Sequence, residues 1–148
     1  MKRIALLIIA LICCSAITFA QKAQSPTQTA ITFYRALKER LYIEGFHHSV
    51  YRNAIEGLTA AEMRELEPEF ARTFTAIPDQ VEGKAEQISG DTATVTLKFG
   101  GIDEPQQIGL IRVSGEWLVG DAEMLAAVKQ QGRAYFFNAG MSANEGEA

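Results

Sequence analysis

The chain contains few of the residues from which covalent and metal-centred sites are built. Its only two cysteines are Cys13 and Cys14, near the start of the 148 residues. Its only two histidines are the adjacent His47 and His48. Beyond residue 14, the sequence therefore excludes a structural disulfide, a thiol nucleophile and a metal site with cysteine ligands.

Positive charge and cofactor motifs are also scarce. Two of the 14 basic residues, Lys2 and Arg3, lie in the first 20 positions, so residues 21–148 carry 12 basic and 18 acidic side chains. An acidic surface without a basic stripe argues against nucleic acid as a partner. The sequence has no phosphate-binding loop, serine elbow, dinucleotide fingerprint or glycine-hinged calcium loop. We therefore predict no cofactor, no bound metal and no nucleic-acid partner.

The first 20 residues have the pattern of a secretory signal peptide. Two basic residues precede an unbroken apolar run over 4–12, and Ala20 offers a small residue before the polar Gln21. We predict cleavage after Ala20, which gives an exported protein, periplasmic or extracellular, without a membrane segment.

Two other interpretations of this segment stay open. Residues 4–20 carry no charge over 17 positions, which is near the lower limit for an uncleaved membrane anchor. Residues 11–14 resemble a bacterial lipoprotein box in which Cys14 is lipidated, although Cys13 stands where such a box has a small residue. The protein would then be a membrane-anchored lipoprotein.

The first half of the mature chain is predicted to be helical. After a short linker over 21–26, Ser25 and Pro26 mark a helix start. Apolar residues recur with helical spacing, first at Ala30, Phe33, Tyr34, Leu37 and Leu41, and then at Ile43, Phe46, Val50 and Ala54. A capping box at Thr59 and Glu62 begins a third helix, which Pro68 should kink or split.

After Pro78 the period of the apolar pattern changes from 3.6 to 2. The strongest strand covers 92–99, where threonines alternate with Ala93, Val95, Leu97 and Phe99. Weaker strands are expected near 81–88, 106–113 and 117–121, and a helix over 122–134. Because apolar residues of 106–113 fall on both faces, that strand is either covered on both sides or bulged near Leu110.

This order of elements predicts an α+β fold. N-terminal helices pack on one face of an antiparallel sheet, and a short C-terminal helix follows. Residues 27–137 form a single domain, and residues 138–148 form a flexible tail. A chain of this length buries about two-thirds of its unfolded surface, so its core needs no disulfide.

Three segments resemble the nuclear-transport-factor-two-like superfamily: the helix face with Phe33, Tyr34 and Leu37, the turn and strand over 90–95, and the hairpin over 113–119 with Trp117. The resemblance covers about residues 26–121 and is closest in style to small exported bacterial members of unassigned function. It implies a curved sheet wrapped over helices, often with a pocket at the wide end of the cone. Members include ketosteroid isomerase, scytalone dehydratase, polyketide cyclases and many non-catalytic binding modules. No position here matches a catalytic motif of theirs, and the helix after the last strand departs from the usual layout.

The weak catalytic candidates are His47, His48, Tyr51 and Asp121. Adjacent helical residues diverge by about 100°, so we interpret the histidines as a solvated surface, on which Glu44 pairs with His48, rather than as a metal site. One histidine together with Tyr51 would alternatively provide a general acid and base. Asp121 is interpreted as a helix cap.

The candidate ligand-pocket residues are all aromatic: Phe33, Tyr34, Tyr51 and Trp117. Tyr34, Tyr42 and Tyr51 are interpreted as rings at the edge of the core with hydrated hydroxyl groups. The resemblance places Tyr34 and Tyr51 on helices that face the pocket. The acidic run over 62–69 is interpreted as a solvated helix face.

Two functions stay open. The favoured hypothesis is an exported, non-enzymatic domain that binds a small apolar ligand or a partner protein in a concave pocket. Under this hypothesis the domain can also form a homodimer through the face of its sheet. The alternative is an acid/base enzyme of the isomerase, cyclase or dehydratase type. Such an enzyme needs at least two titratable groups that converge in an apolar pocket, whereas a binding module needs none.

The signal peptide gives the first testable prediction. Protein taken from its native envelope should have the intact mass of residues 21–148, because cleavage removes the first 20 residues. Intact-mass spectrometry makes this measurement. A retained Met1, or a diacylglycerol adduct on Cys14, would contradict cleavage after Ala20.

Overall fold

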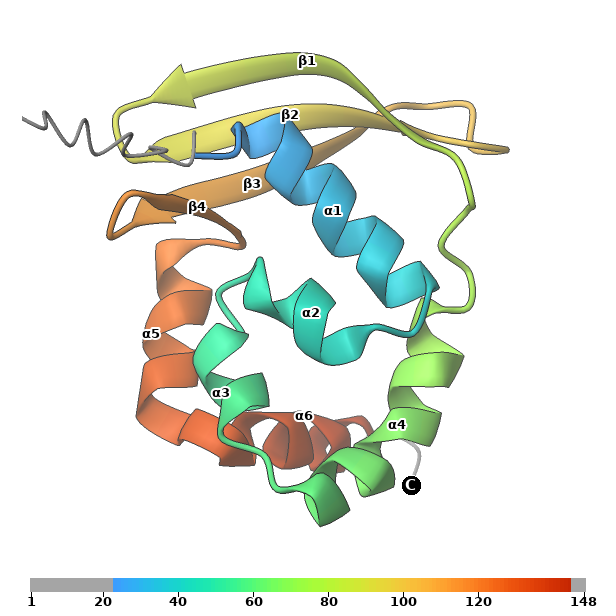
Figure 1. The fold of residues 1–148 in the computed structure, drawn as a ribbon, viewed down its shortest axis with the longest axis vertical. Helices are drawn as coiled ribbons and strands as arrows, with labels where there is room; N and C mark the ends of the chain where they lie inside the picture. Colours follow the sequence, from blue (N-terminus) through green and yellow to red (C-terminus); the bar gives the residue numbers. More distant parts are fainter. Residues whose placement is uncertain (1–22, 145–148) are drawn as a thin grey trace, which may run out of the picture.

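The computed structural model describes residues 23–144, so the predicted signal peptide with Cys13 and Cys14 lies outside the described residues (Figure 1). The chain forms helices, then strands, then helices again. The elements are α1 (Pro26–Lys38), α2 (Tyr42–His47), α3 (Arg52–Glu56), α4 (Ala60–Phe74), β1 (Val81–Ser89), β2 (Thr92–Phe99), β3 (Gln106–Val113), β4 (Glu116–Val119), α5 (Ala122–Gln131), the 3₁₀ helix η1 (Gly132–Ala134) and α6 (Tyr135–Asn144). The fold is α+β, as the sequence predicts.

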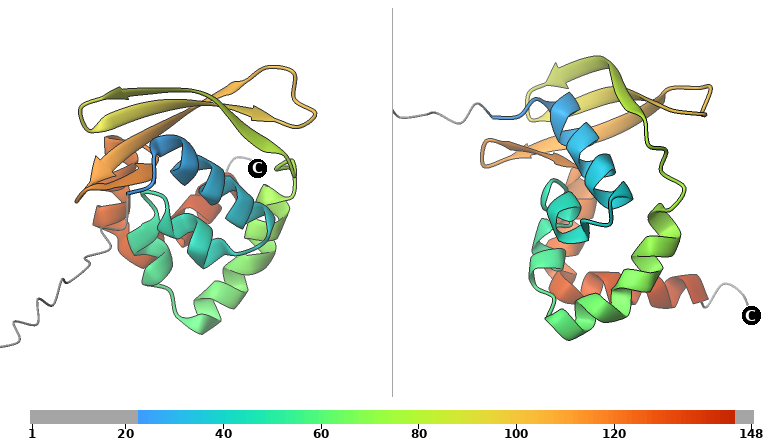
Figure 2. Two further views of the ribbon diagram at one scale, coloured as in Figure 1. Left: turned by 45° about the horizontal axis from the view of Figure 1, so that its top comes forward. Right: turned by 45° about the vertical axis from the view of Figure 1, so that its right-hand side comes forward.

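The four strands form one open antiparallel sheet in the order β1-β2-β3-β4. The helices lie below this sheet in Figure 1, with α1 crossing directly beneath it (Figures 1 and 2). Ser114 and Gly115 join β3 to β4 with φ values of 51° and 83°, which suit a tight two-residue hairpin turn. In β1 the register shifts between Gly83 and Ala85, so the strand carries a bulge.

The inward face of the sheet is set by β2, and the predicted alternation is confirmed. Its four apolar side chains are buried, whereas Thr92 and Thr94 are exposed. The buried set packs into the main core together with three residues of α1: Ala30, Phe33 and Leu37. The sequence pattern therefore fixes which face of the sheet the helices cover.

Two predicted helix starts are confirmed at the level of single hydrogen bonds. The Ser25 hydroxyl accepts a hydrogen bond from the Gln28 amide at 3.2 Å, which caps α1. Thr59 and Glu62 form the predicted capping box at the start of α4. These hydrogen bonds from Thr59 hold the pKa of the Glu62 carboxyl below its usual range. Pro68 lies inside α4, which continues unbroken to its end.

The prediction of one helix over 43–54 is wrong. The chain forms the short helices α2 and α3, and the segment between them pairs with the edge strand β4. The Val50 amide donates to the Val119 carbonyl and the Val119 amide donates to the His48 carbonyl, both at 2.9 Å. Gly120 permits this close approach, because a Cβ there would lie 2.5 Å from a Val50 methyl carbon. The segment thus covers the β4 edge of the sheet.

For β3, the structure decides between the two alternatives left open by the sequence. Leu110 and Ile111 point to opposite faces, and both are buried. β3 pairs with β2 in regular register, so it is not bulged. The burial of Leu110 and Ile111 shows that β3 is covered on both faces there. Ile111 packs in a second small cluster with Val50 and Leu118.

The helix expected over 122–134 is confirmed in outline. The Asp121 carboxylate accepts a hydrogen bond from the Met124 amide at 2.8 Å and caps α5, and η1 continues the helical segment. Gly132, with a φ of 56°, lies at the end of α5 and changes the direction of the chain.

The prediction of a tail from Asn138 is wrong over the described residues, because α6 continues to Asn144. This helix is anchored by Phe136 and Phe137, which pack against the main core. The signal for it was present in the sequence as the aromatic run Tyr135-Phe136-Phe137 just after a glycine. Residues 145–148 lie outside the described part of the chain.

The alternation along β2 gives a prediction about stability. Val95→Asp should lower the free energy of unfolding by more than about 3 kcal/mol, because Val95 is fully buried and the new charge would have no partner. Thr94→Asp, on the exposed face of the same strand, should cost less than about 1 kcal/mol. Denaturant unfolding of the two variants measures the difference, and similar midpoints would show that the assigned faces are wrong.

Candidate functional site

The helices form a partly open apolar pocket of about 360 Å³, which we call the aromatic cavity. Seven of the side chains that line it are aromatic: Phe33, Phe46, Tyr51, Phe70, Phe74, Tyr135 and Phe136. Leu66 and Ala139 add further apolar surface, and the polar members are Glu69 and Thr73. Its walls therefore come from α1, α2, α4, α6 and the residue that precedes α3.

The unpredicted helix α6 supplies one wall of this cavity. The Phe136 ring centroid lies 5.3 Å from that of Phe46 and 5.2 Å from that of Phe70. The Tyr135 ring lies 5.3 Å from that of Tyr51. Such aromatic pairs contribute about 0.5–1.5 kcal/mol each beyond the area that they bury. The aromatic rings that line the cavity therefore also hold α6 against the main core.

Tyr51 is a neutral hydrogen-bonding group at the cavity wall. Burial, together with the neighbouring Tyr135, raises the pKa of the Tyr51 phenol to about 12. Its hydroxyl also lies 3.8 Å from the Met124 sulfur of α5, a weak acceptor. At neutral pH the phenol is protonated, so it can donate a hydrogen bond but cannot act as a base.

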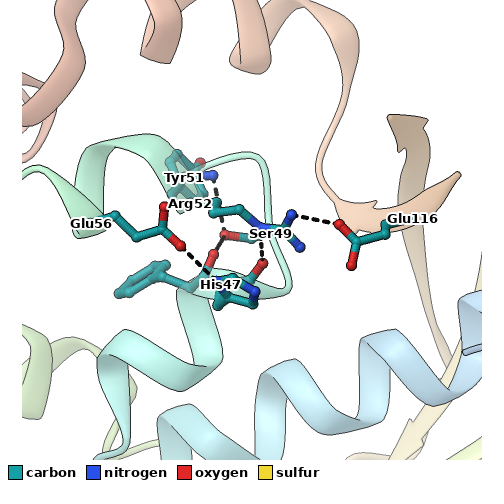
Figure 3. Close-up of polar contacts among 7 residues, drawn as sticks. His47, Ser49, Tyr51, Arg52, Glu56 and Glu116 are labelled. Carbon is teal, nitrogen blue, oxygen red and sulfur yellow. Dashed lines mark hydrogen bonds and ion pairs between the residues drawn. The ribbon is translucent and has the colours of Figure 1, made fainter. Parts of the chain in front are cut away.

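A second group of residues lies where the α2–α3 segment meets β4, and we call it the polar network (Figure 3). His47 Nδ1 lies 2.7 Å from Glu56 Oε1, which joins the end of α2 to α3. Arg52 donates from Nη1 to Glu116 Oε2 and from Nε to the His47 carbonyl, both at 2.7 Å. The guanidinium thus bridges the helical segment and the sheet, and it holds the pKa of the Glu116 carboxyl below its usual range.

The buried Ser49 completes this network. Its hydroxyl donates to the Phe46 carbonyl at 2.7 Å and accepts from the Tyr51 amide at 3.2 Å (Figure 3). These bonds fix the turn between α2 and α3. They place the backbone of His48 against β4 and the ring of Tyr51 in the aromatic cavity.

His48 lies beside a polar pocket of about 310 Å³, whose lining includes Arg52, Glu116, Trp117 and Thr29. Burial lowers the pKa of His48, and the charges of His47 and Arg52 lower it further. The carboxylates of Glu44 and Glu116 oppose this effect. The balance favours the neutral imidazole.

The structure separates the residues that the sequence grouped as site candidates. Phe33 and Tyr51 line the aromatic cavity, whereas Trp117 lines the polar pocket. Tyr34 packs edge-on between Phe33 and Phe99, where burial raises its phenol pKa, and it lines neither the aromatic cavity nor the polar pocket. Asp121 caps α5.

The interpretation of the histidines is corrected in one respect. The sequence suggested that His48 pairs with Glu44 four residues earlier, whereas the ion pair is made by His47 with Glu56. Glu56 lies nine residues away in sequence, beyond the break between α2 and α3. The pairing expected from helical spacing fails because α2 ends at His47, so His48 does not continue the helix that carries Glu44.

Several residues of these sites were not found by sequence reasoning. Arg52 and Glu116 are 64 positions apart, so no local pattern relates them. Tyr135 and Phe136 follow the helix expected over 122–134, and the sequence pattern predicted no role for them. Over residues 23–144 no group of three or more potential metal ligands occurs, and no helix is long and apolar enough to cross a membrane.

The polar network predicts opposite pKa changes for His48 in two variants. The wild-type His48 should titrate below 6.5, the usual value for histidine, because burial and Arg52 disfavour its protonation. Arg52→Gln should raise the His48 midpoint, and Glu116→Gln should lower it further. Titration by NMR of the imidazole protons measures both shifts. Shifts of the same sign in the two variants would contradict the placement of Arg52 and Glu116 beside His48.

Comparison with known protein families, with curated proteins and with solved structures finds no match to this chain.

Proposed function

We propose that this protein is a non-catalytic binding domain that takes a small apolar ligand in the aromatic cavity. The observation that carries the proposal is the lining, in which seven aromatic side chains surround about 360 Å³ of space. Small-molecule sites are concave and mostly apolar, with a few polar groups for orientation and volumes of about 300–1,000 Å³. The Tyr51 phenol and Thr73 would supply the orienting hydrogen bonds.

The distribution of titratable groups supports binding over acid/base catalysis. His47 lies in the polar network and His48 lines the polar pocket, and neither lines the aromatic cavity. The cavity holds the Glu69 carboxylate and two phenols, Tyr51 and Tyr135. Glu69 is already paired with Arg72 on the same helix, and the Tyr51 phenol remains protonated at neutral pH. An acid/base enzyme would need groups in the cavity that can both give and take a proton near neutral pH.

We further propose that the domain is exported and related to the nuclear-transport-factor-two-like superfamily. The order of elements, with helices first and an antiparallel meander after them, supports the relationship. The signal-like pattern of the first 20 residues supports export. α5 and α6 are additions to the usual layout of the superfamily. α6 forms one wall of the aromatic cavity.

Blocking the cavity tests the binding proposal. The probe is 2-ethylnaphthalene, a fluorescent hydrocarbon, which should bind the wild type with a dissociation constant of about 10–100 μM. Thr73→Trp places a large ring at the cavity wall and should weaken binding at least tenfold. Glu65→Trp is the matched control, because Glu65 is also exposed on α4 but lines none of the described pockets. Fluorescence titration measures all three affinities.

Two outcomes would overturn this proposal. If the wild type does not bind the probe, or if Thr73→Trp binds it as tightly as Glu65→Trp, the aromatic cavity is not the site.

The proposal that the domain does not catalyse a reaction has its own test, in which metabolites that raise the melting temperature are recovered after incubation. They should return unchanged. Conversion that slows a hundredfold in His47→Ala or His48→Ala would establish the enzyme alternative instead.

A further inference from the structure

A third pocket lies beside the ring of Tyr42, and we call it the outer groove. It has a volume of about 480 Å³, and its apolar floor is formed by Leu41, Tyr42, Ile43 and Met63. None of these four residues lines the aromatic cavity. The groove lies between the turn that connects α1 to α2 and the first half of α4.

The turn before α2 presents apolar side chains to solvent. Arg40 adopts a left-handed backbone conformation with a φ of 63°, which is uncommon for a residue with a side chain. Directly after it, Leu41 is 46% exposed and Ile43 is 58% exposed. Single exposed apolar residues are ordinary, but here two of them flank a groove of ligand size.

Tyr42, between these two residues, carries an unpartnered polar atom. Its side chain is 3% exposed, and its hydroxyl is the buried side-chain group without a hydrogen-bond partner among residues 23–144. The other tyrosine hydroxyl examined above, that of Tyr51, has a neighbour to bond with. A buried hydroxyl without a partner destabilises the folded protein, so a ligand group that accepts its hydrogen bond would remove this unfavourable contribution on binding.

The Tyr42 ring also separates the outer groove from the aromatic cavity. Its centroid lies 5.3 Å from that of Phe70 and 6.2 Å from that of Phe74, and both of these residues line the cavity. Tyr42 itself lines the groove. A single layer of aromatic rings therefore lies between the outer groove and the aromatic cavity.

The charges around the groove indicate what kind of acceptor it would take. Glu44 and Glu67 place two carboxylates at the groove, against one guanidinium from Arg40. His47, at the same rim, is already paired with Glu56. A ligand with its own carboxylate would be repelled by this acidic surround, whereas a ketone, ester or amide carbonyl would accept from a phenol without that penalty.

We infer that the outer groove is a second ligand site, for a neutral apolar molecule that carries a carbonyl group, and that the Tyr42 hydroxyl donates to this carbonyl. The Tyr42 hydroxyl is covered by neighbouring side chains, so binding requires these side chains to shift. Leu41, Ile43 and Met63 are suited to this movement, because two of them are exposed and the third is an unbranched thioether. The inference does not depend on the function proposed for the aromatic cavity.

The test uses probes that differ only in the acceptor group, in a protein whose aromatic cavity is blocked. The probes are 2-acetylnaphthalene, 2-ethylnaphthalene and 2-naphthoate, and the background is Thr73→Trp. In this background the ketone should bind about three- to tenfold more tightly than the hydrocarbon, because one hydrogen bond is added. The carboxylate should bind less tightly than the ketone.

Variants then locate the site. Tyr42→Phe should abolish the preference for the ketone while leaving the melting temperature equal or higher, because only an unpartnered hydroxyl is removed. Ile43→Ser should weaken ketone binding several-fold. Ile88→Ser is its matched control, since Ile88 is 52% exposed on β1, far from the groove in sequence, and it should change nothing.

The inference is overturned if Tyr42→Phe keeps the ketone preference, if 2-naphthoate binds more tightly than the ketone, or if Ile43→Ser and Ile88→Ser bind alike. A Tyr42→Phe variant that loses stability would show that the hydroxyl has a structural role instead. Because these measurements use the blocked cavity, they can fail while the hydrocarbon still binds the wild type at the aromatic cavity. The two proposals therefore stand or fall separately.

Discussion

The fold depends on the burial of one ring, that of Phe46. This side chain is 3% exposed, and its ring meets rings from four other parts of the chain: Phe33 of α1, Tyr51 before α3, Phe70 and Phe74 of α4, and Phe136 of α6. A helix as short as α2 is not stable alone, so its position comes from this packing. The Phe46 ring thus holds together the helices that line the aromatic cavity. The same packing both stabilises the fold and determines the shape of the cavity.

The polar network complements this apolar centre by fixing the direction in which the chain leaves Phe46. Ser49 bonds to the Phe46 carbonyl, Val50 pairs with Val119, and Arg52 reaches Glu116. Ion pairs at such exposed positions contribute little to stability by themselves. Their effect here is positional, because they tie the α2–α3 segment to the sheet and so hold Tyr51 at the cavity wall.

How far the sequence predicts this structure depends on the range of the interactions. The faces of β2 and the caps at Ser25, Thr59 and Asp121 were predictable, because alternation and capping act over a few residues. The break at Val50 was not, because the helical pattern continues through it and its cause is a strand 69 positions away. Of the residues that line the aromatic cavity, Phe33 and Tyr51 were among the candidates, whereas Phe70 and Phe136 were not, since they meet only in the folded chain.

The central claim is that the aromatic cavity, which Phe46, Phe70 and Phe136 help to line, is a ligand site. Anomalous diffraction from crystals soaked with 2-bromonaphthalene tests it most directly, because bromine reports its own position. The account predicts a bromine peak within the aromatic cavity, in van der Waals contact with at least two of these rings. A well-ordered crystal without a peak there, whether or not bromine occurs elsewhere, would contradict the claim.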